Sequence, residues 1–124
     1  MSVGGKDREL AFHAAMVDVY ARAKAEARYH ATYFLGMISD IGGYQTAKYL
    51  IHTDRPSDGY VALYDRQRLD LTVEAVVLLP EWVDLFTDDE RAIARRRLTD
   101  YRFDVDAYLV AHHDTAGSAG APRG

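Results

Sequence analysis

The sequence predicts an all-α fold, a single compact domain of six to seven short helices. Apolar residues recur at helical spacing along most of the 124-residue chain. Helix start signals precede several of these runs, and no segment offers a partner strand with which a sheet could form. The length suits one domain. We expect the helical domain at 6–113, between a flexible N-terminus at 1–5 and a disordered C-terminal tail at 114–124.

The composition excludes several kinds of site. The chain has no cysteine, which rules out disulfides, cysteine zinc sites, iron–sulfur clusters and thiol nucleophiles. Its net charge of −4 argues against a general coat for DNA or RNA. The N-terminus lacks the apolar core of a signal peptide, and no run approaches the roughly 18 apolar residues of a membrane helix. We therefore expect a soluble, cytoplasmic protein with no membrane partner.

Two helices are predicted before the glycine pair Gly42-Gly43. The segment 6–28 is rich in strong helix formers and contains no glycine or proline. Its inward face is expected to carry Leu10, Ala14, Val17, Tyr20 or Ala21, and Lys24. The second helix, 32–41, is expected to start with Thr32 as its N-cap and to end at the glycine pair. Its apolar side chains repeat at i, i+3, i+4 and i+7, namely Phe34, Met37, Ile38 and Ile41.

Two shorter helices follow. The third is predicted at 44–52, and its inward side chains are Ala47, Leu50 and Ile51. A loop at 53–59 contains proline, glycine, serine and aspartate. Ser57 or Asp58 is expected to cap the fourth helix, which ends near Gln67 or Arg68 and carries Tyr60, Leu63 and Tyr64.

The run 71–79 is ambiguous, because its β-branched and apolar residues also suit a buried strand. We predict a buried helix, since a lone strand would leave its backbone groups unpaired. Asp70 is expected to be the N-cap of this helix, and Glu74 lies near the positive end of its dipole.

The last third of the chain contains the strongest local signal. Pro80 ends the preceding helix, and a short turn supplies core side chains from Trp82, Leu85 and Phe86. Thr87 and Glu90 match a capping box. The helix that they open is expected to bury Ile93, Ala94, Leu98 and Tyr101. Asp104 is the predicted cap of a final helix that carries Val105, Tyr108, Leu109 and His112.

Charged residues near the middle of the chain suggest a catalytic site. Asp70 and Glu74 share a helix face at i, i+4, and paired carboxylates can work as an acid and a base. The catalytic candidates are Asp58, Arg68, Asp70 and Glu74. The alternative, which we favour, is that these groups cap helices and form structural ion pairs.

Basic residues suggest a second possibility, a local surface for nucleic acid. The candidates are Lys48, Arg95, Arg96 and Arg97. Three consecutive arginines on a helix point in different directions, and acidic residues lie nearby, so a solvated helix face is the alternative that we favour. The five histidines show no metal-ligand spacing, and no cofactor-binding fingerprint is present, so we expect neither a metal nor a cofactor.

Nine tyrosines favour a third function, recognition of a protein partner. Tyrosine is common both at half-buried core positions and at protein interfaces. The partner-surface candidates are Tyr44, Tyr49, Tyr60 and Tyr64. The leading hypothesis is a small non-catalytic interaction or regulatory module that acts through a protein partner or as a homodimer. Nucleic-acid association and an enzyme with a carboxylate and arginine site remain the alternatives.

Three segments together resemble a family of short bacterial helical proteins and domains of unknown function. They are the GGxxTAKxLI run that begins at Gly42, the SDG loop at Ser57 with the RLDLTVEA run after it, and the ARRRL helix. The resemblance covers about Tyr29 to Phe103. The family has Asn-Pro where this chain has His30-Ala31, which affects only the start of the second helix. The resemblance implies a helical fold and no activity, so it supplies no catalytic residues.

Overall fold

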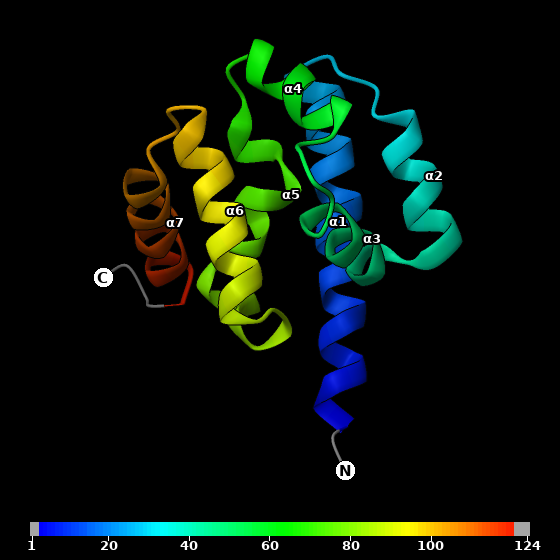
Figure 1. Cartoon of the computed structure of the whole chain (residues 1–124). Helices are drawn as coiled ribbons and strands as arrows, with labels where there is room; N and C mark the ends of the chain where they lie inside the picture. The colour runs from blue at the N-terminus through cyan, green and yellow to red at the C-terminus, as the bar shows by residue number, and fades with distance from the viewer. Residues whose placement is uncertain (1–2, 121–124) are drawn as a thin grey trace.

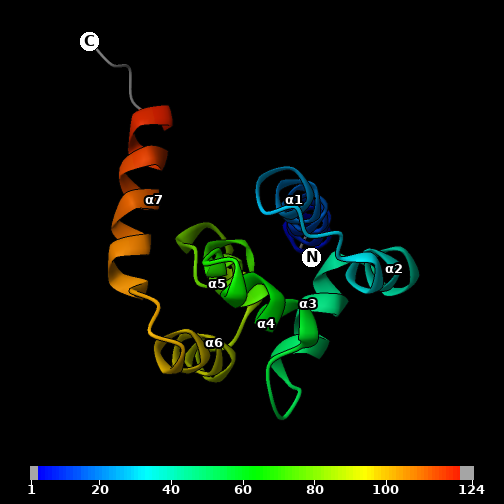
Figure 2. The same ribbon diagram turned by 90° about the horizontal axis from the view of Figure 1, so that it is seen from above.

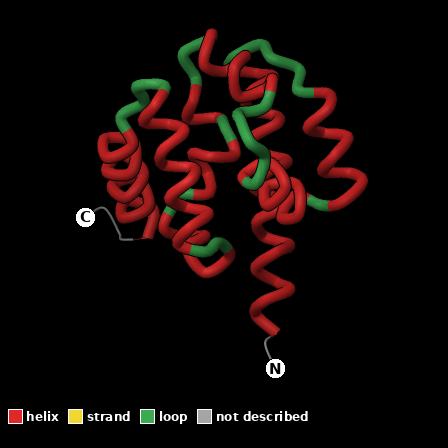
Figure 3. Tube along the Cα trace, viewed as in Figure 1, coloured by secondary structure: helices red, strands yellow, loops and turns green. Residues whose placement is uncertain are grey.

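The chain is entirely helical over the part that the structure describes. The computed structural model describes the backbone of residues 3–120 and the side chains of residues 5–112. Seven α-helices and two short 3-10 helices follow one another in this part of the chain, without a β-strand (Figure 3). They are α1 (Val3–Glu26), α2 (Thr32–Ile41), α3 (Gly43–Ile51), α4 (Asp58–Asp65), η1 (Leu69–Leu71), α5 (Val73–Val77), η2 (Pro80–Leu85), α6 (Asp88–Asp100) and α7 (Val105–Gly120). The all-α prediction is confirmed.

Helices lie at both ends of the described chain. α1 begins at Val3, within the segment 1–5 that we expected to be flexible, and residues 1–2 lie outside the described part. α7 reaches Gly120, but the description of side chains stops at His112 and that of the backbone at residue 120. Of the tail expected to be disordered at 114–124, the backbone of 114–120 is described as the end of α7, and residues 121–124 lie outside the described part, so its disorder stays a prediction.

The short helix α5 lies at the centre of the fold. It packs against α6, α3 and both 3-10 helices. α1 packs against α3, while α2 lies at the outer edge beside them (Figures 1 and 2). α7 packs against α6 on the opposite side of the molecule, and the N-terminal end of α1 extends beyond the other helices (Figure 1). No helix of residues 3–120 is both long and apolar enough to span a membrane.

Most predicted helix boundaries are confirmed by their capping groups. The Ser57 side chain accepts a hydrogen bond from a first-turn amide of α4. Thr87 and Glu90 form the predicted reciprocal capping box of α6. Asp104 accepts a hydrogen bond of 3.0 Å from a first-turn amide of α7. Gly42 ends α2 with φ of 86°, a conformation that glycine adopts without strain.

Two predicted caps are wrong. Thr32 is the first residue of α2 and does not cap it, because α2 has no side-chain cap. Asp70 lies in η1 and pairs with Arg68, and Thr72 caps α5 instead. The run 71–79 is helical rather than extended, as predicted, but its α-helix is only five residues long and follows a 3-10 turn.

The inward face of α1 also differs from the prediction. Leu10 and Val17, which we expected inside, are exposed. The buried side chains of α1 are instead Phe12, Met16, Val19 and Ala23. Both sets repeat at helical spacing, so periodicity alone does not distinguish them. Contacts with the rest of the fold decide which set is buried.

An aromatic core joins α1 to α3 and η2. Phe12 makes edge-on contacts with Trp82 and Phe86, with ring centroids 5.2 Å apart in both pairs. α1 and α3 approach most closely at Gly43, whose amide donates a 2.8 Å hydrogen bond to Nδ1 of His13. A Cβ atom at Gly43 would lie 2.7 Å from the Cα of His13. Only glycine therefore fits this crossing of the two helices.

Candidate functional site

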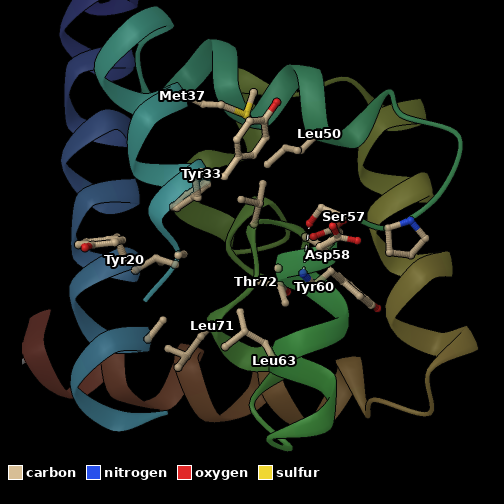
Figure 4. Close-up of a pocket in the computed structure, with 18 of the residues that line it drawn as sticks. Tyr20, Tyr33, Met37, Leu50, Ser57, Asp58, Tyr60, Leu63, Leu71 and Thr72 are labelled. Atoms are coloured by element: carbon tan, nitrogen blue, oxygen red, sulfur yellow. Dashed lines mark hydrogen bonds between the residues drawn. The ribbon is translucent and has the colours of Figure 1, made fainter. Parts of the chain in front are cut away.

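A pocket of about 360 Å³ opens beside the C-terminal half of α1. Figure 4 shows side chains from α1, α2, α3, α4 and η1 gathered around it. Its lining residues range from Val19 to Glu74, so six helices that are separate in the sequence contribute to it, the sixth being α5. The volume lies at the lower end of the roughly 300–1,000 Å³ of ligand-binding pockets.

The pocket is mainly apolar and is rich in tyrosine. Leu63, Leu71 and Val73 contribute buried aliphatic side chains. Five of the nine tyrosines also line it, namely Tyr20, Tyr29, Tyr33, Tyr49 and Tyr60. Tyr33 is 78% exposed and Tyr49 is 55% exposed. These two rings therefore lie at the surface of the pocket, where an incoming partner can reach them.

Several polar groups of the pocket already have partners within the fold. The hydroxyl of Ser57 accepts a 3.1 Å hydrogen bond from the amide of Tyr60, which is the cap of α4 (Figure 4). The Thr72 hydroxyl accepts 3.2 Å from the α5 amide of Ala75 and donates 2.7 Å to a backbone carbonyl. These hydroxyls stabilise helix ends, which leaves them poorly suited to act as nucleophiles.

Glu74 lines the pocket and forms a buried ion pair with Arg97 of α6. The guanidinium of Arg97 lies 3.0 Å from the Glu74 carboxylate, and both side chains are almost completely buried. Arg97 also donates to the backbone carbonyl of Leu50, at 2.9 Å, and to that of Thr53. Burial raises the pKa of Glu74 above its ordinary value, although the hydrogen bond from Arg97 acts in the opposite direction. This network joins α6 to α5 and to the end of α3.

The burial of Arg97 was not predicted from the sequence. We expected a solvated arginine run, but only two of its three members are exposed. Arg97 lies four residues after Ile93 and three after Ala94, on the apolar face of α6. This spacing is the sequence feature that indicates its burial.

A second buried carboxylate fastens α6 to α3. Glu90 accepts hydrogen bonds from the ammonium of Lys48 and from Nε2 of His52, both at 2.7 Å. It also accepts 2.9 Å from the amide of Thr87 as part of the capping box. Burial by itself disfavours the ionised carboxylate, but these hydrogen bonds outweigh it and lower the pKa of Glu90 to about 2. Lys48 and His52 therefore serve an ion-pair network at this position.

The four catalytic candidates do not converge. Arg68 forms a bidentate pair with Asp70, at 2.9 and 3.0 Å, and reaches Glu26 of α1 at 2.7 Å. Neither Arg68 nor Asp70 lines the pocket, whereas Asp58 and Glu74 do. Arg68 and Asp70 thus belong to an ion-pair cluster that holds η1 against α1, whereas Asp58 and Glu74 belong to the pocket.

Three of the four nucleic-acid candidates are paired with carboxylates. Lys48 contacts Glu90 as described, and Arg97 contacts Glu74. Arg95 lies 3.2 Å from Asp106 of α7. Arg96 is exposed. Lys48 thus lies on α3 and the three arginines on α6, and carboxylates from three different helices offset the charge of three of the four candidates.

The four partner-surface tyrosines have two kinds of environment. Tyr44 and Tyr60 belong to the core, where their hydroxyls donate to backbone carbonyls at 2.7 and 2.9 Å. Tyr49 and Tyr64 are exposed, and of these Tyr49 lines the pocket. Tyr33, the most exposed of the pocket tyrosines, was not among the predicted partner-surface residues. Its only sequence signal is its place next to Phe34 in the apolar run of α2.

Among the residues with described side chains, no group of three or more His, Asp or Glu residues is placed to hold a metal ion. In comparisons with known proteins, no family model, no curated protein and no solved structure matches the chain. The resemblance to a family of short bacterial proteins therefore gains no support from these comparisons.

Proposed function

We propose that the chain is a small non-catalytic interaction module that binds a protein partner through the tyrosine-lined pocket. The observation that carries this proposal is an open apolar pocket with two exposed tyrosines, Tyr33 and Tyr49, at its surface. Tyrosine contributes a large contact area with little loss of side-chain freedom, and it is enriched among the residues that dominate binding energy.

The chemistry of the lining supports binding more than catalysis. Ser57 and Thr72 are engaged as helix caps, and Glu74 is paired with Arg97. Arg55 and Asp58 line the pocket and are exposed. An apolar interior with charged groups at its edge matches the usual organisation of a protein interface, an apolar centre inside a polar rim. We infer that the partner inserts one or two apolar side chains and places polar groups near Arg55 and Asp58.

Selection from a displayed peptide library tests this function. The full chain is the bait, and the variants Tyr33→Ala and Tyr49→Ala are used to identify peptides that require the pocket. Each substitution should weaken such a peptide at least about fivefold, because truncation of a central interface tyrosine costs more than about 1 kcal/mol. Tyr64→Ala is the matched control, since Tyr64 is also exposed but does not line the pocket.

Peptides that share an apolar anchor, and that bind the wild type and the Tyr64→Ala variant but not the pocket variants, would support the proposal. A selection in which every binder is indifferent to Tyr33 and Tyr49 would contradict it.

A further inference from the structure

α1 carries an apolar stripe that faces away from the rest of the fold. Leu10 is 62% exposed and Val17 is 41% exposed, and Ala14 and Ala21 are exposed on the same stripe. These four residues are separated by steps of four, three and four, the spacing of an a/d seam in a coiled coil. Such a seam is normally covered by another helix.

We propose that this stripe binds the same stripe of a second copy, so that two α1 helices pair antiparallel in a two-fold symmetric homodimer. In that arrangement, positions whose numbers add up to 31 lie opposite each other. Leu10 then faces Ala21 of the second copy, and Val17 faces Ala14. Each large side chain meets a small one, so the two helices approach closely and leave no gap along the seam.

Charges at the two ends of the stripe select the same register. Asp7 and Lys24 are both exposed, and their numbers also add up to 31. Each end of the antiparallel pair therefore brings an aspartate of one copy next to a lysine of the other. A parallel pair would instead bring Asp7 next to Asp7 and Lys24 next to Lys24, and it would align alanine with alanine. The charge pattern thus favours a second copy of this chain in the antiparallel orientation.

The dimer surface is separate from the pocket. The four stripe residues do not line the pocket. The residues of α1 that line it are Val19, Tyr20 and Ala23. The N-terminal end of α1 extends past the other helices, where a second copy has room to approach (Figure 1). This inference therefore does not depend on the proposed pocket function, and each can fail without the other.

The mass of the full chain in solution, measured by light scattering over a range of concentrations from low micromolar upward, tests the dimer. The wild type should be a dimer, and Leu10→Glu should weaken dimerisation by at least about tenfold, because both copies then place a charge in the apolar seam. Val110→Glu is the matched control: Val110 is 60% exposed on α7, outside the stripe, so this variant should stay dimeric.

Reversal of the end charges tests the register. Asp7→Lys and Lys24→Asp should each weaken the dimer, because like charges then meet, and the double variant should restore it. These residues are exposed, so the variants should keep their helical circular dichroism spectrum.

Engineered cysteines test the orientation, since the chain has none of its own. A mixture of Leu10→Cys and Ala21→Cys should form a mixed disulfide. Leu10→Cys alone should not link to itself, because its two copies would lie roughly 16 Å apart along the helices, beyond the reach of a disulfide. A wild type that is monomeric throughout, a dimer indifferent to Leu10→Glu, or Leu10→Cys that readily links to itself would overturn the proposal.

Discussion

Removal of one member of the buried Glu74–Arg97 pair should destabilise the fold strongly, because it leaves the other charge buried without a partner. Arg97→Met deletes the ion pair of 3.0 Å and the hydrogen bonds to two carbonyls at the end of α3. It leaves the Glu74 carboxylate buried without its cation. Loss of one member of a buried pair costs about 3–5 kcal/mol, a large part of the roughly 5–15 kcal/mol of a typical domain.

A second substitution should recover part of that loss. In the double variant Glu74→Gln/Arg97→Met no buried charge is left unpaired, so it should be more stable than Arg97→Met alone. The control is Arg96→Met, at the exposed neighbouring position, which should change the free energy of unfolding by less than about 0.5 kcal/mol.

The loss in Arg97→Met should also depend on pH. Burial already raises the pKa of Glu74, and the variant lacks the cation that opposes this rise. A carboxyl whose pKa is higher in the folded state than in the unfolded state favours folding at low pH and loses that contribution as the pH rises through the folded pKa. The difference in stability between Arg97→Met and wild type should therefore be smaller at pH 5 than at pH 7.

Urea unfolding, followed by helical circular dichroism and by the fluorescence of the buried Trp82, measures all of these free energies at one protein concentration. A double variant less stable than Arg97→Met, or an Arg97→Met variant that loses no more stability than Arg96→Met, would contradict the predicted cost of an unpaired buried charge.

Two further predictions concern the junctions of α3. The pKa of Glu90 is lowered from 4.5 to about 2, so its ionised carboxylate contributes at most about 3 kcal/mol to the free energy of unfolding. This contribution should be complete above pH 4.5 and should be lost as the pH falls toward 2. Glu90→Gln should be less stable than the wild type at pH 7, and its unfolding free energy should fall less steeply with acid in acid unfolding curves. Gly43→Ala should destabilise the chain by about 1–3 kcal/mol, because the added Cβ would lie 2.7 Å from the Cα of His13. Gly36→Ala is the control in urea unfolding, because no atom lies within 4 Å of its added Cβ, and this variant should be neutral or stabilising. Equal losses of unfolding free energy in Gly43→Ala and Gly36→Ala would contradict the steric origin of the effect at Gly43.

Local signals were enough to predict most of the helices. The capping box of Thr87 and Glu90, the Ser57 cap and the left-handed Gly42 each depend on residues within four positions of one another. Asp70 and Thr72 lie two residues apart and both have side chains that can cap a helix, but only Asp70 was predicted as the cap. The choice between them depends on Arg68, which holds Asp70 in an ion pair that also reaches α1.

Tertiary contacts explain what local signals did not predict. α1 has two apolar faces, and Phe12 rather than Leu10 is buried because the core supplies aromatic partners for it. Arg97 is buried because carbonyls at the end of α3 and the Glu74 carboxylate surround it. The pocket brings together residues from Val19 to Glu74, and no pattern within one helix identifies such a set.

Chemical-shift mapping of a bound peptide tests the proposed pocket most directly. A peptide from the selection described above is titrated into the ¹⁵N-labelled full chain, and the amide signals are followed for the wild type and for Tyr33→Ala. The pocket function predicts that shifts concentrate near Tyr33, Tyr49 and the start of α4 and that they are much smaller in the variant. Shifts that concentrate elsewhere, or that persist unchanged in Tyr33→Ala, would show that the partner surface is not this pocket.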